Sequence, residues 1–250
     1  MDLKGKVALV TGGARRVGRV IALALAQRGM HVMVHYNRSE EAAAQTVEEI
    51  RALGVRGEMV QGNLGNPLDI EQVFVAHESH FGQLDVLVNS AATFESGDVL
   101  ELTVEDWNYV MAINLRAPFL CSQRAAHLML ARGTGGVIVN IADIGGIVPW
   151  VRYPHHSVSK AGLIMLTKVL AKSLGPELRV NAVVPGAVLK PEHMPDARWE
   201  QMGKVLPLRR VGGPEHVAHA VIALAENDFI TGAVLHVDGG DTLLGVADFL

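Results

Sequence analysis

The stretch Thr-Gly-Gly-Ala-Arg-Arg-Val-Gly-Arg at residues 11–19 follows the apolar run Val-Ala-Leu-Val at residues 7–10. A short, fully apolar run is typical of a strand that is buried on both faces, and the glycine-rich turn after it opens a helix expected over residues 17–28. Free backbone N–H groups and the helix dipole at such a turn favour a bound pyrophosphate. The sequence therefore predicts a phosphate-binding turn formed by Gly12, Arg15, Arg16, Val17 and Gly18.

Apolar runs and segments of helical periodicity alternate along the chain. The expected strands cover residues 7–10, 31–34, 84–88, 137–141, 180–184 and 233–237, with a weaker candidate at 56–61. The expected helices cover residues 17–28, 40–53, 68–81, 104–131, 157–174 and 214–226. Such alternation requires right-handed crossovers and a parallel sheet covered on both faces. The sequence therefore predicts one α/β domain over residues 1–250, a doubly wound Rossmann fold of about seven strands.

Composition limits the classes of partner. The chain has 250 residues, 49% of them apolar and 19% charged, and a formal net charge of -4. Its lysines and arginines form no basic stripe, so neither nucleic acid nor a membrane is expected as a partner. The single cysteine, Cys121, excludes an intrachain disulfide, and no targeting segment is recognised, so we expect a cytoplasmic protein. The histidines lack metal-ligand spacing, so no metal site is expected.

The end of the second expected strand indicates the type of cofactor. An acidic residue at this place would bond the ribose hydroxyls of NAD(H) and repel a 2′-phosphate. The chain instead has His-Tyr-Asn-Arg-Ser at residues 35–39, with a guanidinium group and a hydroxyl group available to that phosphate. The sequence therefore predicts NADP(H), held here by Tyr36, Asn37, Arg38 and Ser39. Asn63 and Leu64, after the third strand, are expected to flank the adenine.

A long irregular segment follows the sixth expected strand. Residues 187–213 contain Pro191, Pro195 and Pro207 together with glycines, which interrupt any regular element. Loops of this length in compact domains are usually functional. We therefore expect a substrate-lid loop at about residues 187–213.

Several motifs together resemble the short-chain dehydrogenase/reductase family, and in particular its pteridine reductase branch. They are the arginine-containing turn at 11–19, HYNRS at 35–39, NSAATF at 89–94, NIADIGG at 140–146 and RVNAVVPGAVLKPE at 179–192. The resemblance spans nearly the whole chain and implies a small-molecule substrate and a homotetramer. It also implies further cofactor contacts from Asn89, Ser90, Ala91, Lys160, Pro185, Gly186 and Val188.

The same resemblance implies roles for three site residues. Asp143 stands where most members of the family have a catalytic serine, as an aspartate does in the pteridine reductases. Asn114 matches the asparagine that holds a water in the proton relay, and Phe94 is similar to the aromatic residue that stacks on the pterin.

One departure concerns the catalytic pair. The family has Tyr-x-x-x-Lys, whereas this chain has His156 four residues before Lys160. Both side chains should share a helix face, so Lys160 can still hold the nicotinamide ribose. His156 is either a proton donor or a spectator. We expect desolvation to raise the pKa of Asp143, so that it delivers a proton through water. Tyr153 could supply a hydroxyl group or form only the pocket wall.

The leading hypothesis is an NADPH-dependent reductase of a dihydropterin or a related imine or carbonyl compound, which stacks between nicotinamide and Phe94. A general carbonyl reductase of the 3-oxoacyl type is an alternative, although Asp143 in place of serine argues against it. A third hypothesis is a catalytically silent NADP(H)-binding protein or an inactive partner subunit, because His156 replaces the tyrosine.

Overall fold

The computed structural model describes residues 1–192 and 194–244, so residue 193 and residues 245–250 of the expected domain lie outside the description. Within the described residues, seven strands form one parallel sheet in the order β3-β2-β1-β4-β5-β6-β7. The strands are β1 (Val7–Thr11), β2 (His31–Tyr36), β3 (Gly57–Gln61), β4 (Val86–Asn89), β5 (Gly136–Ile141), β6 (Leu178–Pro185) and β7 (Val234–Val237). The weak candidate at 56–61 is therefore a strand, and the predicted doubly wound fold is confirmed.

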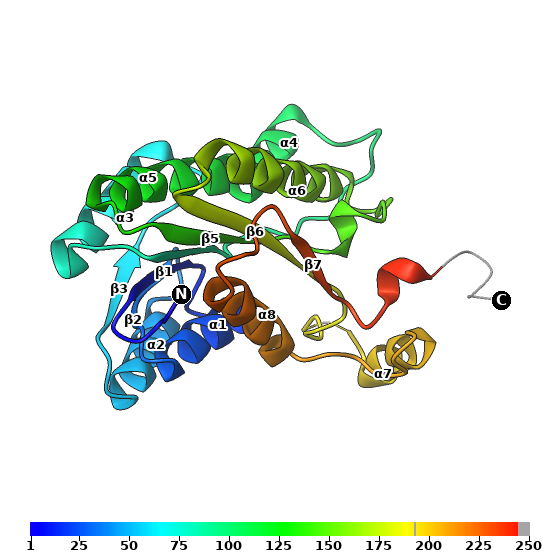
Figure 1. Ribbon diagram of the computed structural model, residues 1–250. Coiled ribbons are helices and arrows are strands. Elements are labelled where there is room, and N and C mark those ends of the chain that lie inside the picture. The colour runs from blue at the N-terminus through cyan, green and yellow to red at the C-terminus, as the bar shows by residue number, and fades with distance from the viewer. Residues whose placement is uncertain (193, 245–250) are drawn as a thin grey trace.

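Helices cover both faces of the sheet, as Figure 1 shows. One face carries α1 (Arg16–Gln27), α2 (Glu40–Ala52) and α8 (Pro214–Glu226); the other carries α3 (Pro67–Phe81), α5 (Ala117–Arg132) and α6 (Pro154–Leu174). Successive side chains of a strand point to opposite faces. Accordingly, Ala8 and Val10 pack in the core beneath α1 and α8, whereas Leu9 packs in the core beneath α3 and α5. This double burial explains the continuous apolar runs in the sequence.

The helix expected over residues 104–131 is not continuous. It divides into α4 (Val104–Met111), a π-helical turn η1 (Ala112–Arg116) and α5. Pro118 has no N–H group to donate to the carbonyl group of Asn114, and its ring would crowd that carbonyl. The Ala117 N–H group bonds the Ala112 carbonyl instead, five residues back, so the helix widens before the proline. This turn holds Asn114, one of the expected site residues.

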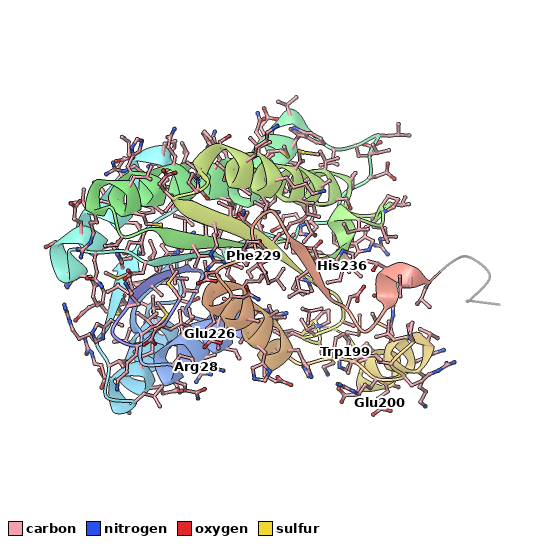
Figure 2. All side chains as sticks on the ribbon, viewed as in Figure 1. Arg28, Trp199, Glu200, Glu226, Phe229 and His236 are labelled. Carbon is pink, nitrogen blue, oxygen red and sulfur yellow. The ribbon has the colours of Figure 1, made fainter. Side chains whose placement is uncertain are left out.

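The segment expected to be a loop over residues 187–213 contains a helix, α7 (Asp196–Val205). Pro195 precedes the helix as its N-cap residue and Pro207 follows its end, so these prolines border the helix without interrupting it. Figure 2 shows Trp199 on the side of α7 that faces the rest of the molecule and Glu200 on the outer side. The segment expected to form a lid is therefore partly helical and presents an aromatic side chain inward.

Candidate active site

A cleft of about 840 Å³ opens at the carboxyl ends of the central strands. The order of strands reverses between β1 and β4, and doubly wound folds bind their ligands at such a reversal. The cleft is lined by residues that directly follow four strands: Gly12 after β1, Ser90 after β4, Ala142 after β5 and Gly186 after β6. The chain therefore folds its expected binding residues around one cavity.

The phosphate-binding turn forms one wall of the cleft. All five of its predicted residues, from Gly12 to Gly18, line the cavity. A Cβ atom at Gly12 would lie 2.9 Å from Ala91 Cα, and one at Gly18 would lie 2.2 Å from the Gly12 carbonyl oxygen. Both positions therefore require glycine. Arg16 has a positive φ of 54°, a conformation that glycine adopts more easily, so the turn keeps a glycine-like backbone where the family has a glycine. The two glycines therefore let the turn pack closely on itself and on the residues that follow β4.

A buried histidine that the sequence did not single out fixes the turn. His35 Nδ1 accepts a hydrogen bond from the Gly12 N–H group at 3.1 Å, and Nε2 lies 3.0 Å from the Gly62 carbonyl oxygen. Because one partner is a donor and the other an acceptor, the imidazole is neutral with its proton on Nε2. Burial lowers the pKa of His35 to about 4, although the hydrogen bond to Gly62 acts in the opposite direction.

The expected adenine end of the cofactor site is only partly confirmed as cleft lining. Asn37, Asn63 and Leu64 line the cleft. Tyr36 is buried in the core, Arg38 is exposed and Ser39 is half-buried, and these three residues lie outside the lining. Arg38 follows Asn37 directly, so its contact with a 2′-phosphate stays a prediction.

Two arginines inside the cleft carry the positive charge near the turn. Arg15 and Arg16 lie 3.6 and 4.0 Å from the Glu192 carboxylate of the lid segment. All three side chains are largely exposed, so the ion pairs contribute little to stability. The arginines are free to turn toward an anionic ligand.

Three further cofactor contacts were expected at the end of β6. Pro185 and Gly186 line the cleft, whereas Val188 is buried outside the lining.

The loop after β4 supports the cleft from below. The Ser90 and Ala91 N–H groups both donate to Thr11 Oγ1, at 3.0 and 3.1 Å, and both residues line the cavity. Asn89 is buried beneath them, and its Nδ2 donates to Asn140 Oδ1 at 2.8 Å. Its amide therefore holds β4 to β5, and the expected contact between Asn89 and the cofactor stays a prediction.

Asp143 and His156 form a hydrogen-bonded pair at the other end of the cleft. Asp143 Oδ2 lies 2.7 Å from His156 Nε2, and Asp143 Oδ1 accepts from the Gly145 N–H group at 2.9 Å. The Asp143 side chain is 21% exposed and that of His156 only 2%. Both residues line the cleft, and the aspartate is the more exposed of the two.

The charge state of Asp143 differs from the expectation. Burial acts to raise the pKa of Asp143, but the His156 hydrogen bond, the Lys160 charge and the Gly145 N–H group together hold it below its usual value. The expected rise of the Asp143 pKa is therefore wrong, because desolvation is outweighed by these three partners. Asp143 is a carboxylate at neutral pH.

Asn114 fixes the residues around His156. Its Oδ1 accepts from the Thr93 N–H group at 2.8 Å, and its Nδ2 donates to the Thr93 carbonyl oxygen at 3.0 Å. The same Nδ2 lies 3.3 Å from His156 Nδ1. Asn114 is buried and does not line the cleft, so it reaches the site through Thr93 and His156.

Lys160 lies at the base of the cleft, one turn after His156 on α6 as expected. Its Nζ donates to the Ile141 carbonyl oxygen at 2.9 Å. Burial lowers the pKa of the Lys160 ammonium group, and the nearby Asp143 carboxylate acts in the opposite direction. The ammonium group retains hydrogen atoms that can bind a ribose hydroxyl group.

Aromatic side chains surround the pair. Phe94 lines the cleft, stacks on Tyr153 at a centroid distance of 4.3 Å and meets the His156 ring edge-on at 4.8 Å. Trp150 lies parallel to the His156 ring at 5.9 Å. Tyr153 precedes α6 as its N-cap residue and lies outside the lining. Its ring packs against Phe94, and a substrate contact of Tyr153 stays a prediction.

The described ranges contain neither a membrane-spanning helix nor a metal-binding group of side chains. No helix within residues 1–192 and 194–244 is long and apolar enough to cross a membrane. Those same ranges contain no group of three or more His, Cys, Asp or Glu residues that could hold a metal ion.

The chain is similar to a large group of known proteins. It matches a family model described as Enoyl-(Acyl carrier protein) reductase over residues 12–242. It is 38% identical to a 3-oxoacyl-[acyl-carrier-protein] reductase of Synechocystis sp., over 95% of this chain and 97% of that protein. It is 35% identical to a 3beta-hydroxysteroid dehydrogenase 1 of Eggerthella lenta, over 97% and 95% of the two chains. The crystal structure of a blue fluorescent protein from a metagenomic library, in complex with NADPH, has a TM-score of 0.88 and 34% identity, covering 96% of this chain and 99% of that one.

Proposed function

The chain belongs to the short-chain dehydrogenase/reductase family, and from this premise we propose that it is an NADPH-dependent reductase of C=O or C=N bonds in small molecules. The observation that carries the proposal is the end of the cleft where Lys160 lies beside the hydrogen-bonded Asp143 and His156. Lys160 would bind the cofactor ribose, and Asp143 and His156 would stabilise the charge that develops at the bond that is reduced. The expected homotetramer stays a prediction from the family resemblance.

Three features support NADP(H) as the cofactor. Arg15 and Arg16 line the cleft beside the phosphate-binding turn, and β2 is followed by Asn37 where NAD(H)-binding folds have an acid. A similar solved protein is in complex with NADPH. The tightly packed turn at Gly12 and Gly18 would bind the pyrophosphate through its backbone, and Lys160 would hold the nicotinamide ribose. The bound cofactor supplies the hydride.

Asp143 and His156 take the place of the family's serine and tyrosine. When a neutral C=O bond is reduced, its oxygen must gain a proton as the hydride reaches the carbon. For a ketone, that proton would have to come from the His156 ring through Asp143 Oδ2, 2.7 Å from Nε2, because the family's tyrosine and serine are both replaced. Asn114 and Thr93 hold the opposite ring nitrogen, so the imidazole cannot rotate freely.

Two substrate classes are candidates. A dihydropterin or related planar imine is favoured by the half-exposed ring of Phe94 in the cleft and by the carboxylate of Asp143. A 3-oxoacyl compound or another ketone is favoured by the names of the similar proteins, a 3-oxoacyl reductase and a hydroxysteroid dehydrogenase. Both classes use the same hydride donor, and they differ in how the proton is supplied.

The test measures oxidation of NADPH with a dihydropterin and with a ketone, for the parent protein and for His156→Tyr and Asp143→Asn. If Asp143 serves a planar imine, the parent reduces the dihydropterin, Asp143→Asn abolishes this activity and His156→Tyr changes it little. If the protein is an impaired carbonyl reductase, His156→Tyr raises ketone turnover by roughly 10²–10⁴-fold. His219→Tyr, at an exposed position on α8, is the matched control.

A different result would contradict the enzyme proposal. NADPH binding, shown by calorimetry, without turnover of either substrate in the parent or in His156→Tyr would favour the catalytically silent NADP(H)-binding protein. Preference for NADH over NADPH in the binding experiment would contradict the cofactor assignment.

A further inference from the structure

The substrate end of the cleft combines a carboxylate with aromatic walls and offers no proton to a bound molecule. On the basis of the proposed function, we propose that the substrate is a cation, a cyclic iminium compound whose C=N⁺ carbon receives the hydride. Asp143 is the anion that binds the C=N⁺ group, and Phe94, Trp150 and Trp199 form the walls around its rings. An iminium substrate restricts the proposed reductase to one class of compound. It also explains why the family's tyrosine, a proton donor, can be replaced.

The hydrogen bonds of Asp143 keep this residue ionised. Its two carboxylate oxygens accept from His156 Nε2 at 2.7 Å and from the Gly145 N–H group at 2.9 Å. Both contacts stabilise the anion, and the Lys160 charge does so as well. The His156 ring also lines the cleft, but it is almost completely buried and its Nε2 is engaged by Asp143. The group that a substrate meets is therefore a base without a proton to donate.

The chemistry of hydride transfer differs between a ketone and an iminium ion. A ketone gains a hydride at carbon and a proton at oxygen, so it requires an acid. An iminium ion gains only the hydride: the new C–H bond forms, the C=N π-electrons become the nitrogen lone pair, and a neutral amine results. NADPH loses the hydride, with its two electrons, and becomes NADP⁺. Atoms and charge balance without any proton transfer, so a site that lacks the family's phenol can complete this reaction.

The charged residues that line the cleft also favour a cationic substrate. Among the residues that the structure describes, the charged side chains in the cleft are Arg15, Arg16, Lys160, Asp143, Glu192 and Asp241. The two arginines belong to the phosphate-binding turn, and the lysine donates to the Ile141 carbonyl oxygen. Cofactor phosphates would draw the arginines away from Glu192 and leave its carboxylate unpaired. The rest of the described lining then has one cation, Lys160, and three carboxyl groups, those of Asp143, Glu192 and Asp241.

Asp241, another carboxyl group of the cleft lining, has a negatively charged neighbour. Burial raises the pKa of Asp241, and the neighbouring Asp238 raises it further. A cation in the cleft would relieve this repulsion between carboxyl groups.

The aromatic walls agree with a cationic ring system. Phe94 and Trp150 meet edge to face at 5.8 Å, and Trp199 of α7 lines the cleft from the lid. Aromatic faces attract cations, most strongly when water is excluded, and cages of such residues bind alkylated ammonium groups. A planar cyclic iminium presents both the charge and the flat apolar surface that this lining accommodates.

The first experiment compares two bicyclic substrates of similar shape with NADPH: N-methyl-3,4-dihydroisoquinolinium, a permanent cation, and 1-tetralone, a neutral ketone. We expect kcat/KM for the iminium to exceed that for the ketone by at least roughly a hundredfold beyond the ratio without protein, because only the ketone needs the missing acid. Equal or faster reduction of the ketone would overturn the proposal while leaving the reductase function intact.

The second experiment does not depend on turnover. Calorimetry measures binding of 2,2-dimethyl-1,2,3,4-tetrahydroisoquinolinium, a cation that cannot be reduced, and of its uncharged analogue 2,2-dimethyltetralin to the NADPH complex. We expect the cation to bind more tightly, and Asp143→Asn to weaken its binding roughly tenfold to a hundredfold with little effect on the neutral analogue. Glu200→Gln, on the outer side of α7, is the matched control.

These outcomes separate the two proposals. Tight binding of the cation, sensitive to Asp143→Asn, supports the site even if the chosen iminium reacts slowly. Cation binding that is no tighter than that of the neutral analogue, or is unchanged in Asp143→Asn, refutes the cationic substrate. Absence of NADPH oxidation with the iminium, the ketone and the dihydropterin refutes the reductase function itself.

Discussion

Replacement of His35 by leucine tests whether this buried ring holds the phosphate-binding turn. The change leaves the Gly12 N–H group and the Gly62 carbonyl group without the imidazole partners that lie at 3.1 and 3.0 Å. A buried polar group without a partner costs about 1–3 kcal/mol, so we expect the free energy of unfolding to fall by about 2–6 kcal/mol. NADPH should also bind more weakly, because the Gly12 backbone is no longer fixed.

The pH dependence gives a sharper test. Burial lowers the pKa of His35 from 6.5 to about 4 in the folded protein. Below pH 6.5 the unfolded chain therefore binds a proton at His35 that the folded protein does not, so stability falls as the pH drops toward about 4 and then levels off. At about 1.4 kcal/mol per pKa unit, His35 alone accounts for a loss of about 3 kcal/mol. His77, whose pKa burial also lowers to about 4, adds a second loss in the same range.

Urea unfolding between pH 4.5 and 7.5 measures this dependence. The slope of unfolding free energy against pH should decrease in His35→Leu by up to about 1.4 kcal/mol per pH unit relative to the parent, because one buried histidine with a lowered pKa is removed. His219→Leu, at an exposed position, should keep the parent slope. An unchanged slope in His35→Leu would refute the assignment of a neutral, buried His35.

Three further predictions follow from the site and the core. Arg38→Ala should weaken NADPH binding roughly tenfold to a hundredfold and leave NADH binding almost unchanged in a fluorescence titration, and equal losses for both cofactors would contradict a 2′-phosphate contact. Gly18→Ala should abolish NADPH binding in the same titration, because its Cβ would lie 2.2 Å from the Gly12 carbonyl oxygen; Gly54→Ala, where space is open, is the control despite a positive φ. Cys121 should not react with Ellman's reagent until the protein unfolds, since burial raises the pKa of its thiol to about 12, and rapid labelling of the folded protein would contradict this.

The sheet could be predicted from sequence because each central strand is buried on both faces and therefore reads as a continuous apolar run. The π-helical turn at Ala112–Arg116 was missed, although Pro118 indicates it, because its missing N–H group leaves the Asn114 carbonyl without a helical donor. The helix α7 was missed because Pro195 and Pro207 were read as interruptions, although a proline beside a helix end is compatible with the helix.

The site was predictable where one element presents several residues and less so where partners come from distant segments. Lys160 and His156 share α6, so their proximity follows from helical spacing. His35 bonds residues 12 and 62, and nothing near it in the sequence indicates those partners. The expected direction of the Asp143 pKa shift was wrong for the same reason. The sequence indicates burial, which raises the pKa, but not the hydrogen bond from His156, which lowers it.

The substitutions at positions 143 and 156 belong together. Serine and tyrosine, which the family has at these places, are neutral hydroxyl groups that can pass a proton to an oxygen. A carboxylate paired with imidazole makes this end of the cleft anionic, because the His156 hydrogen bond and the Lys160 charge both favour ionised Asp143. A tyrosine placed beside that carboxylate would be a weaker acid, since loss of its proton would create a second negative charge next to the first. His156 instead donates to Asp143 Oδ2 at 2.7 Å and so favours the ionised form of the aspartate.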